Sequence, residues 1–460
     1  MATLPYFVLG PSTVLSALGL VRGPDRTIPT PAENWRDARV DVIIPALNEQ
    51  EHVALALASI IRQTMQPRRI ILVDDGSDDQ TVEVAEAYCS SQDLEIIVIR
   101  RRKPIGKTPT IKRQARELDS DVEFILDADT ILASEDYIAR TVEELYQAAG
   151  VGSACGTILP LRRKDRDAWA SHPDTLGFSR IVPRQESPRI RKWLHDLSRG
   201  ITNLYREVLY LFLQKFVYHG QMEYFGSTAN PVGCAVAYRR KYVKSLFDHF
   251  SPLLGDDLTN SEDIFIGLAM LDQGYRNIQL TDVYAWTVEP GVHQLPRQVY
   301  LWSSAFLQSC FYLDPLVKSP LRAAKRAWEA VSDASSRGGA ERRRLREPYR
   351  QAFGRQRTVQ FGRPAGWLLM MGAVEKVFFP TALLVMAILG NWRGLALTVL
   401  VETLIGVLVL ALVMKGRRLE YIVKGLAVAP MRYALAAFEL VTLGRFANDM
   451  WLTKNRKWRK

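Results

Sequence analysis

Hydrophobic positions follow two alternating periods between about residues 40 and 126. Four short runs rich in Val, Ile and Leu are typical of buried strands, namely residues 41–47, 69–73, 94–99 and 122–126. The segments between them, residues 50–63, 79–89 and 108–118, repeat apolar positions with a helical period. This βαβαβαβ order predicts an α/β fold, with a mostly parallel sheet covered by helices on both faces.

Acidic residues follow three of these four predicted strands. Glu49 comes after the first strand, Asp74 and Asp75 after the second, and Asp127 and Asp129 after the fourth. In parallel α/β sheets ligands bind at the carboxyl ends of the strands, so these five carboxylates are expected at one sheet edge. Because like charges repel, the cluster predicts a bound cation or a ligand rich in hydrogen-bond donors.

The spacing of Asp127 and Asp129 suits a hard divalent cation. Mg²⁺ or Mn²⁺ is often held by one or two carboxylates while a diphosphate fills other positions. Lys107 offers a point charge for a phosphate. Each of these motifs is weak alone, since Asp-Gly after a strand is usually only a turn. Their joint placement at successive strand ends carries the prediction of a nucleotide-diphosphate site.

Apolar residues are far denser between residues 366 and 414 than in the first half of the chain. Residues 367–390 and 394–414 each reach the roughly 20 residues that a membrane-crossing helix needs. They predict a helical hairpin turned at residues 391–392. Buried core helices are the alternative, because Glu375, Lys376 and Glu402 interrupt the two runs.

The segments around this hairpin have mixed character. Residues 5–21 are apolar but short, which favours an interfacial or half-buried helix, and residues 420–446 carry charges typical of an interfacial or re-entrant segment. The basic residues at 415–418 place both outer ends of the hairpin, and hence the first 360 residues, in the cytosol. A multi-pass protein of the cell (inner) membrane is expected, with the basic tail at 454–460 facing anionic lipid.

Composition and charge exclude several classes of protein. The chain has 460 residues, of which 48% are hydrophobic and 24% charged, so it is neither disordered nor collagen-like. The four cysteines have no metal-type spacing, and free thiols in a reducing compartment are expected. The net charge of +11 lies largely in the Arg-rich segment at 342–363 and near the membrane segments. No nucleic-acid-binding motif accompanies it, so lipid contact is favoured over nucleic acid.

Several motifs, in order, resemble a known family. They are Pro45–Glu49, Val73–Ser77, Gly106–Lys107 and Leu126–Asp129, followed by Asn230–Ala235 and Ser261–Ile264. The set resembles the nucleotide-sugar and acceptor signature of family 2 glycosyltransferases, which have the GT-A fold. Membrane-integrated polysaccharide synthases of the cellulose, chitin and hyaluronan type are the most similar members. The resemblance covers about residues 40–310.

The resemblance implies a role for each motif residue. Glu49 and Asp75 would contact the base and ribose with Asp74 nearby, and Asp127 and Asp129 would hold the metal and diphosphate. Glu262 would belong to the substrate site. Asp263 would be the general base of a single inverting displacement. Thr259 and Glu262 have capping-box spacing, which would place Asp263 in the first helical turn. Asp257 is the alternative base, because Gly255–Asp257 resembles the acidic motif of hyaluronan synthases.

One motif departs from the family. Processive members carry Q-x-x-R-W after the base, and this chain has Gln298 and Trp302 but Leu301 at the Arg position. Gln298 and Trp302 still share one helix face, and Trp302 can stack on a sugar ring. The missing guanidinium removes a diphosphate-pairing fork and puts processivity in doubt. The alternative is that residues 298–313 form only an interfacial helix.

Together these observations predict five regions and one function. The regions are residues 1–38 (apolar, membrane-associated), 39–297 (GT-A), 298–365 (interfacial helix and basic linker), 366–414 (hairpin) and 415–460 (interfacial helix and tail). A metal-dependent transferase is expected to move sugar from a nucleotide sugar, with UDP the expected nucleotide, to a growing polysaccharide. A lipid-linked or oligosaccharide acceptor, or a non-catalytic subunit of a synthase, are the alternatives. Two spans are too few to enclose a polymer channel, so self-association or a membrane partner subunit is also expected.

Overall fold

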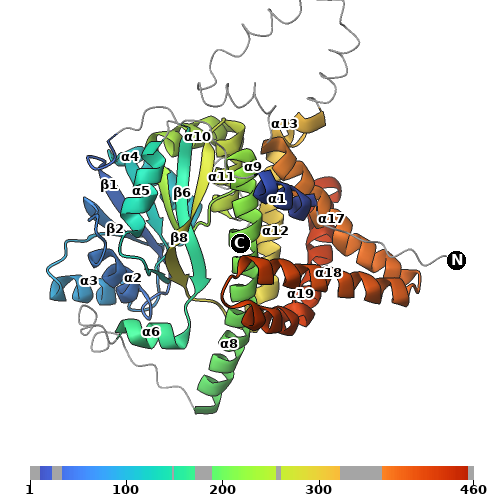
Figure 1. The fold of residues 1–460 in the computed structure, drawn as a ribbon. Helices are drawn as coiled ribbons and strands as arrows, with labels where there is room; N and C mark the ends of the chain where they lie inside the picture. The colour runs from blue at the N-terminus through green and yellow to red at the C-terminus, as the bar shows by residue number, and fades with distance from the viewer. Residues whose placement is uncertain are drawn as a thin grey trace, which may run out of the picture.

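The computed structural model describes residues 11–22, 34–147, 150–170, 189–254, 261–321 and 365–453. These residues form an α/β layer and a helical part, which lie side by side (Figure 1). Helix α8 (Arg189–Phe212) runs along the junction between the two parts.

The α/β layer contains an eight-stranded sheet with the order β3-β2-β1-β4-β7-β6-β8-β5. The strands are β1 Val40–Ala46, β2 Arg69–Asp74, β3 Ile97–Arg100, β4 Val122–Leu126, β5 Thr130–Leu132, β6 Val151–Pro160, β7 Ala235–Arg239 and β8 Arg276–Thr287. The first four strands are parallel, as predicted. Strand β7 is antiparallel to both of its neighbours, β4 and β6, so the sheet is mixed in its second half.

Two hydrophobic clusters pack on the two faces of the sheet. Helices α2 (Val53–Ile61), α3 (Thr81–Ser91) and α5 (Tyr137–Gln147) cover one face. Helices α4 (Lys107–Glu117), α10 (Arg240–Leu254) and α11 (Glu262–Asp272) cover the other. The predicted layered α/β fold is confirmed. Because both faces are buried, the strand ends are where polar side chains can meet a ligand.

The helical part is built around α8. The remaining elements are α1 Pro11–Arg22, α6 Arg163–Ala170, the π-helix η2 Leu213–Tyr218, α9 His219–Phe225, η3 Val292–Gln294, α12 Leu295–Tyr312, α13 Asp314–Val317, α17 Ala365–Ile388, α18 Trp392–Val413, α19 Arg418–Ala447 and η4 Asn448–Leu452. Helix α1 packs closely on α9, and its Ser16 hydroxyl donates a hydrogen bond to the Val217 carbonyl of the preceding η2 at 3.2 Å.

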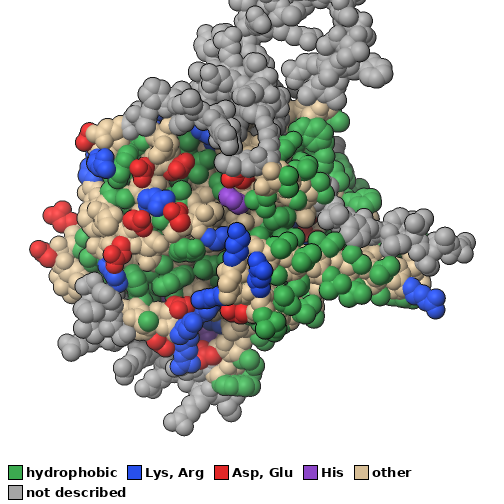
Figure 2. All heavy atoms as spheres, viewed as in Figure 1, with side chains coloured by type: hydrophobic (Ala, Val, Ile, Leu, Met, Phe, Trp, Pro, Cys, Tyr) green, Lys and Arg blue, Asp and Glu red, His purple; other side chains and the backbone are tan. Residues whose placement is uncertain are grey.

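Three helical segments are long and apolar enough to cross a membrane: Gly366–Ile388, Trp392–Val413 and Arg418–Leu452. The first two are the predicted hairpin, and their outward side chains form a large apolar surface on α17 and α18 (Figure 2). The third was expected to be interfacial because of its charges. In the structure those charges are paired inside the bundle, Arg432 with Glu402 and Glu439 with Lys376. Pairing lowers the cost of placing them at membrane depth.

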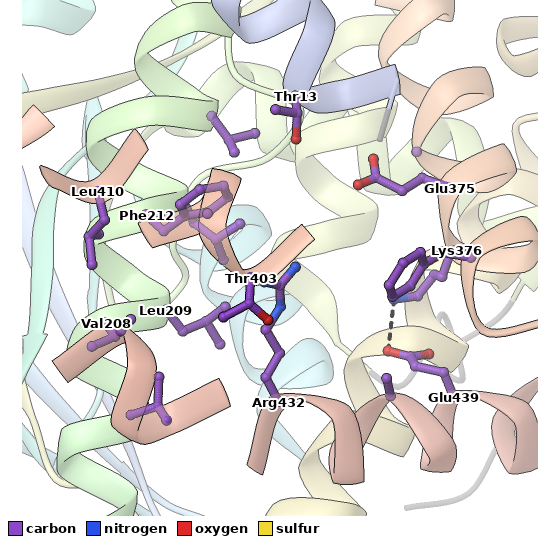
Figure 3. A pocket seen from close by; sticks show the side chains of 18 of the residues that line it. Thr13, Val208, Leu209, Phe212, Glu375, Lys376, Thr403, Leu410, Arg432 and Glu439 are labelled. Carbon is purple, nitrogen blue, oxygen red and sulfur yellow. Dashed lines mark hydrogen bonds and ion pairs between the residues drawn. The ribbon is translucent and has the colours of Figure 1, made fainter. Parts of the chain in front are cut away.

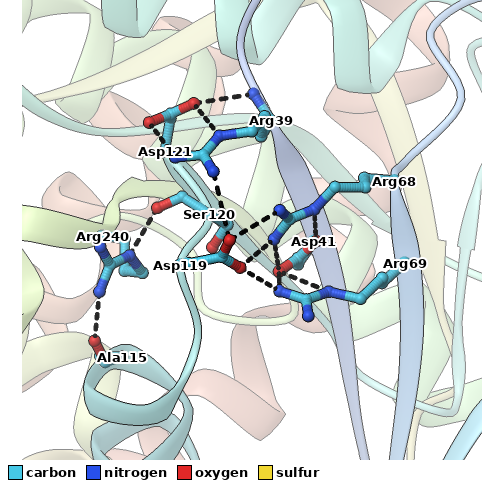
Figure 4. A network of polar contacts seen from close by, with 9 residues as sticks. All are labelled: Arg39, Asp41, Arg68, Arg69, Ala115, Asp119, Ser120, Asp121 and Arg240. Atoms are coloured by element: carbon cyan, nitrogen blue, oxygen red, sulfur yellow. Dashed lines mark hydrogen bonds and ion pairs between the residues drawn. The ribbon is translucent and has the colours of Figure 1, made fainter.

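The amino-terminal edge of the sheet carries an ion-pair network (Figure 4). Asp41 begins β1 beside Arg69 of β2, and its carboxylate is fully buried. It accepts hydrogen bonds from Arg68 at 2.8 Å and from Arg69 at 2.7 Å. Asp119 accepts from both arginines as well, but its side chain is 64% exposed. The network ties the turn before β4 to the starts of β1 and β2, at the edge opposite the predicted site.

Removing the buried member of this network should weaken the fold without touching the chemistry. Asp41→Ala is expected to lower the free energy of unfolding by about 2–3 kcal/mol, because the charge-assisted hydrogen bonds from Arg68 and Arg69 lose their buried acceptor. Asp119→Ala should cost much less, since water screens that exposed pair. Thermal unfolding of the two detergent-solubilised variants checks this. Equal losses for the two variants would contradict it.

Candidate active site

Side chains from three elements converge at the carboxyl ends of the parallel strands. Lys107 begins α4, Asp127 follows β4, and Glu262 begins α11. The Lys107 ammonium lies 2.6 Å from Asp127 Oδ1 and 2.8 Å from Glu262 Oε1, and it donates a hydrogen bond to the Gly233 carbonyl at 3.1 Å. Burial opposes the charge on Lys107, but the two carboxylates raise its pKa well above the usual value. The structure therefore unites three residues that lie far apart in the sequence.

Asp263 lies in the first turn of α11, directly after Glu262. Its Oδ2 accepts a hydrogen bond from the Gly233 amide at 3.1 Å, and its Oδ1 accepts from the Ile264 amide at 2.8 Å and from the Ser261 hydroxyl. A Cβ on Gly233 would lie 2.6 Å from the Asp263 Cβ, so only glycine fits there. Burial, and next the charge of Glu262, raise the pKa of Asp263. Asp263 is thus a positioned carboxylate with raised basicity.

Ser261 is the residue that precedes the first turn of α11. The capping-box prediction is therefore wrong, because Glu262 is the first helical residue and not the third after a cap at Thr259, although Asp263 does lie in the first turn. Thr259 itself and the alternative base, Asp257, lie outside the described residues. The comparison between Asp263 and Asp257 therefore stays open to experiment.

Asp129 is surrounded by further acidic groups. Burial, then the charges of Asp127, Glu49 and Glu289, raise its pKa well above the usual value. Within the described part of the chain Asp129 has no ion-pair partner, and its one side-chain hydrogen bond comes from the Thr130 hydroxyl at 3.3 Å. This all-oxygen, uncompensated set fits a hard divalent cation.

No complete protein cage for a metal is present among the described residues, since no three His, Cys, Asp or Glu side chains group closely enough to hold an ion. Mg²⁺ and Mn²⁺ do not need one, because one or two carboxylates suffice when substrate phosphates and water complete the shell. Asp127 and Asp129 remain the residues that would hold such an ion.

The other predicted donor-site residues are held by local contacts. Asp75 accepts hydrogen bonds from the Ile105 and Gly106 amides at 3.0 and 2.7 Å and from Arg101 at 2.9 Å. It therefore shapes the loop that leads into Lys107. Asp74 accepts from the Ser77 amide at 3.1 Å, and Glu49 lies 3.0 Å from the His52 ring. Their contacts with a nucleotide stay predictions.

Gln298 and Trp302 lie on α12 and share a partner that the sequence analysis did not identify. Arg206 of α8 donates a hydrogen bond to Gln298 Oε1 at 2.5 Å and stacks over the Trp302 ring at 4.3 Å from its centroid. Glu289, which follows β8, lies 3.5 Å from the same guanidinium. Two features of the sequence could have indicated this contact. Arg206 is the one arginine in the apolar run at 201–218, and Glu289 is a carboxylate that follows a strand.

A cavity of about 450 Å³ lies on the membrane side of α8 (Figure 3). Most of its lining is apolar, including Val208, Leu209 and Phe212 of α8. The Lys376–Glu439 ion pair lines one side (Figure 3). Its walls come from α8 and from all three candidate membrane helices, so the cavity lies between α8 and the membrane part.

Comparison with known proteins defines the class. Residues 41–247 match glycosyl transferase family 2, a range that holds the strand-end carboxylates and Lys107. This segment of the chain is a family 2 glycosyltransferase domain. The fold agrees: the mannosyltransferase PcManGT from Pyrobaculum calidifontis, solved with GDP-Man and Mn²⁺, superposes with a TM-score of 0.51 over 96% of this chain and 95% of its own. Their sequences are only 14% identical, so the likeness shows the fold.

Two bacterial relatives illustrate the range of named activities. An N-acetylglucosaminyltransferase of Azorhizobium caulinodans is 25% identical over 272 residues, which cover 58% of this chain and 59% of the relative. An undecaprenyl-phosphate 4-deoxy-4-formamido-L-arabinose transferase of Proteus mirabilis is 30% identical over 136 residues, 28% of this chain and 39% of the relative. The aligned parts span less than two thirds of these relatives.

Proposed function

We propose that this protein is a membrane-bound, inverting glycosyltransferase that moves a sugar from a nucleotide sugar to an acceptor hydroxyl at the cytosolic membrane face. The observation that carries the proposal is the position of Asp263. Two backbone amides orient its carboxylate beside the cluster of Lys107, Asp127 and Glu262. A base held next to a diphosphate site is what a single displacement needs.

In the proposed reaction Asp263 accepts the proton of the acceptor hydroxyl. The acceptor oxygen forms a bond to the anomeric carbon while the bond from that carbon to the nucleoside diphosphate breaks on the opposite face, so the configuration inverts. Lys107, which is paired with Asp127 and Glu262, would supply positive charge to the leaving phosphate. A divalent ion at Asp127 and Asp129 would offset negative charge on the leaving diphosphate.

The direct test uses purified protein in lipid vesicles, Mn²⁺ or Mg²⁺, and a panel of labelled UDP- and GDP-sugars. Transfer or donor hydrolysis with one donor supports the proposal. UDP is the expected nucleotide, and transfer from GDP-sugars alone would correct that expectation. No turnover of any donor with any ion, by a correctly folded protein, would favour the non-catalytic subunit instead.

The acceptor has two candidates. A growing polysaccharide follows from the resemblance to synthases, and it would require self-association or a partner subunit to complete a channel. A lipid-linked acceptor is favoured by the cavity, because its apolar walls suit a hydrocarbon chain. The undecaprenyl-phosphate relative supports the same candidate. The length of the product, and its extraction into organic solvent, separate the two.

Filling the cavity should reduce transfer to a lipid-linked acceptor. Gly406 of α18 lines the cavity, and a Cβ there would meet only the Arg432 guanidinium, at 3.4 Å. Gly406→Leu is expected to reduce transfer to a lipid-linked acceptor about tenfold, because the added side chain takes the volume of the hydrocarbon. Donor hydrolysis should not change.

The matched control is Gly444→Leu on α19, where a Cβ would meet no atom within 4 Å. Both changes raise helix propensity, so a difference between their rates of transfer to the lipid-linked acceptor reports the effect of filling the cavity. Transfer to lipid acceptor at the wild-type rate by Gly406→Leu would argue against a lipid chain in this cavity.

A further inference from the structure

Arg206 is among the largest fully buried side chains described, with 1% of its surface exposed. A buried arginine is costly unless its charge and its donors are satisfied. Here the guanidinium donates to Gln298 Oε1 at 2.5 Å, lies 3.5 Å from Glu289 Oε2, and stacks on Trp302 at 4.3 Å. Gln298 and Trp302 belong to α12 and Glu289 follows β8, so Arg206 connects α8, the end of β8 and α12.

One end of this arrangement reaches the donor site. The amide of Val288, the residue before Glu289, donates a hydrogen bond to the Asp129 carbonyl at 3.2 Å. Glu289 is itself 3% exposed. Arg206 therefore bridges the segment beside the metal-binding carboxylates and the helix that carries Gln298 and Trp302, and α8 and α12 lie side by side (Figure 1).

The other end is an aromatic ring that is still accessible. Trp302 keeps 37% of its surface exposed although Arg206 covers one face of its indole. A planar guanidinium suits this role because it stacks on the ring and donates within its own plane to Gln298, which a lysine cannot do. A partly exposed indole whose orientation is fixed by a stacked guanidinium can serve as a platform for the apolar face of a sugar ring.

We propose that Arg206 is a positioning residue for the acceptor: it holds Trp302 and Gln298 as a platform for a pyranose ring next to the donor site. Arg206 reaches the helix face of Gln298 and Trp302 from α8. This inference rests on the proposed transferase function: a sugar-stacking role for Trp302 is what the family resemblance implies, and the positioning role of Arg206 is what the structure adds.

The test removes the Arg206 guanidinium. The assay measures transfer to the oligosaccharide that the wild type uses best among short glucose, mannose and N-acetylglucosamine oligomers. Arg206→Leu is expected to raise the acceptor KM about tenfold, because the ring loses a desolvated cation–π partner and Gln298 loses its donor. The donor KM should stay within about twofold.

Arg445→Leu is the matched control, because that arginine stacks over Tyr300 of the same helix, 5.4 Å from the ring centroid. It should leave the acceptor KM unchanged. If Arg206→Leu does not fold, Arg206→Lys keeps a cation opposite Glu289, and a raised acceptor KM is expected there too. An unchanged acceptor KM in Arg206→Lys and Arg206→Leu, or an effect confined to the donor KM, would overturn the inference. Absence of donor hydrolysis and of transfer to any oligosaccharide or lipid-linked acceptor by the wild type would instead refute the proposed function.

Discussion

Asp263→Asn is expected to lower the rate of sugar transfer by about 10²–10⁴-fold, the usual contribution of a general base. Asparagine keeps the size of the side chain, and its single oxygen can still accept from one of the two amides, Gly233 or Ile264, so the fold should survive. It cannot take up the acceptor proton at neutral pH. Steady-state transfer by the purified variant, with nucleotide binding measured in parallel, checks that chemistry and not donor binding is lost.

The wild-type pH profile tests the same role. Transfer needs the deprotonated carboxylate, and burial together with Glu262 raises the pKa of Asp263. The rate should therefore fall on acidification at a higher pH than an ordinary Asp would give, and this limb should vanish in Asp263→Asn.

Two further variants test the assignment of Asp263 as the general base. Asp248→Asn changes a half-exposed carboxylate on α10 that pairs with Arg116, and it should leave transfer intact. Asp257→Asn tests the alternative base. If Asp257→Asn lost transfer while Asp263→Asn kept it, the base would be Asp257.

Asp129→Ala is expected to lower transfer by about 10³-fold, because metal assistance contributes several kcal/mol and about 1.4 kcal/mol is a factor of ten. Asp129 has no ion-pair partner among the described residues, and neighbouring carboxylates surround it. Its loss should also weaken Mn²⁺-dependent nucleotide binding, which calorimetry measures without turnover.

Asp136→Ala provides the control for Asp129→Ala, since its side chain is 48% exposed and its nearest cation is Arg140 at 3.9 Å. It should retain metal-stimulated transfer. Undiminished Mn²⁺ stimulation and nucleotide binding in Asp129→Ala would show that the ion, if used, is held elsewhere.

Local sequence patterns were enough to predict the strands and helices in the first half of the α/β domain. The strands around Ile43, Ile71 and Phe124 are continuous apolar runs, and the helices between them repeat every three to four residues, so each element could be predicted from its own segment. Parallel strands place their carboxyl ends at one edge, which is why Asp127 and Asp129 could be assigned to a site from their position after β4.

The charged helices of the membrane part show where such patterns fail. Glu402, Arg432 and Glu439 argued against deep burial when counted one by one in their own segments. Packing places Arg432 against Glu402, and Glu439 against Lys376. Helix α19 is a candidate span by its length and composition, and these pairs, which only the tertiary structure shows, offset part of the cost of its charges.

By itself the sequence determined the α/β class, the acidic strand ends and the helix start that carries Asp263, because each depends on residues that are neighbours along the chain. Only the tertiary structure decided which side chains meet. It brought Lys107 between Asp127 and Glu262, and it set Arg206 against Trp302. Such contacts join residues far apart in sequence, and their geometry follows from how whole helices and strands pack, which no local period encodes.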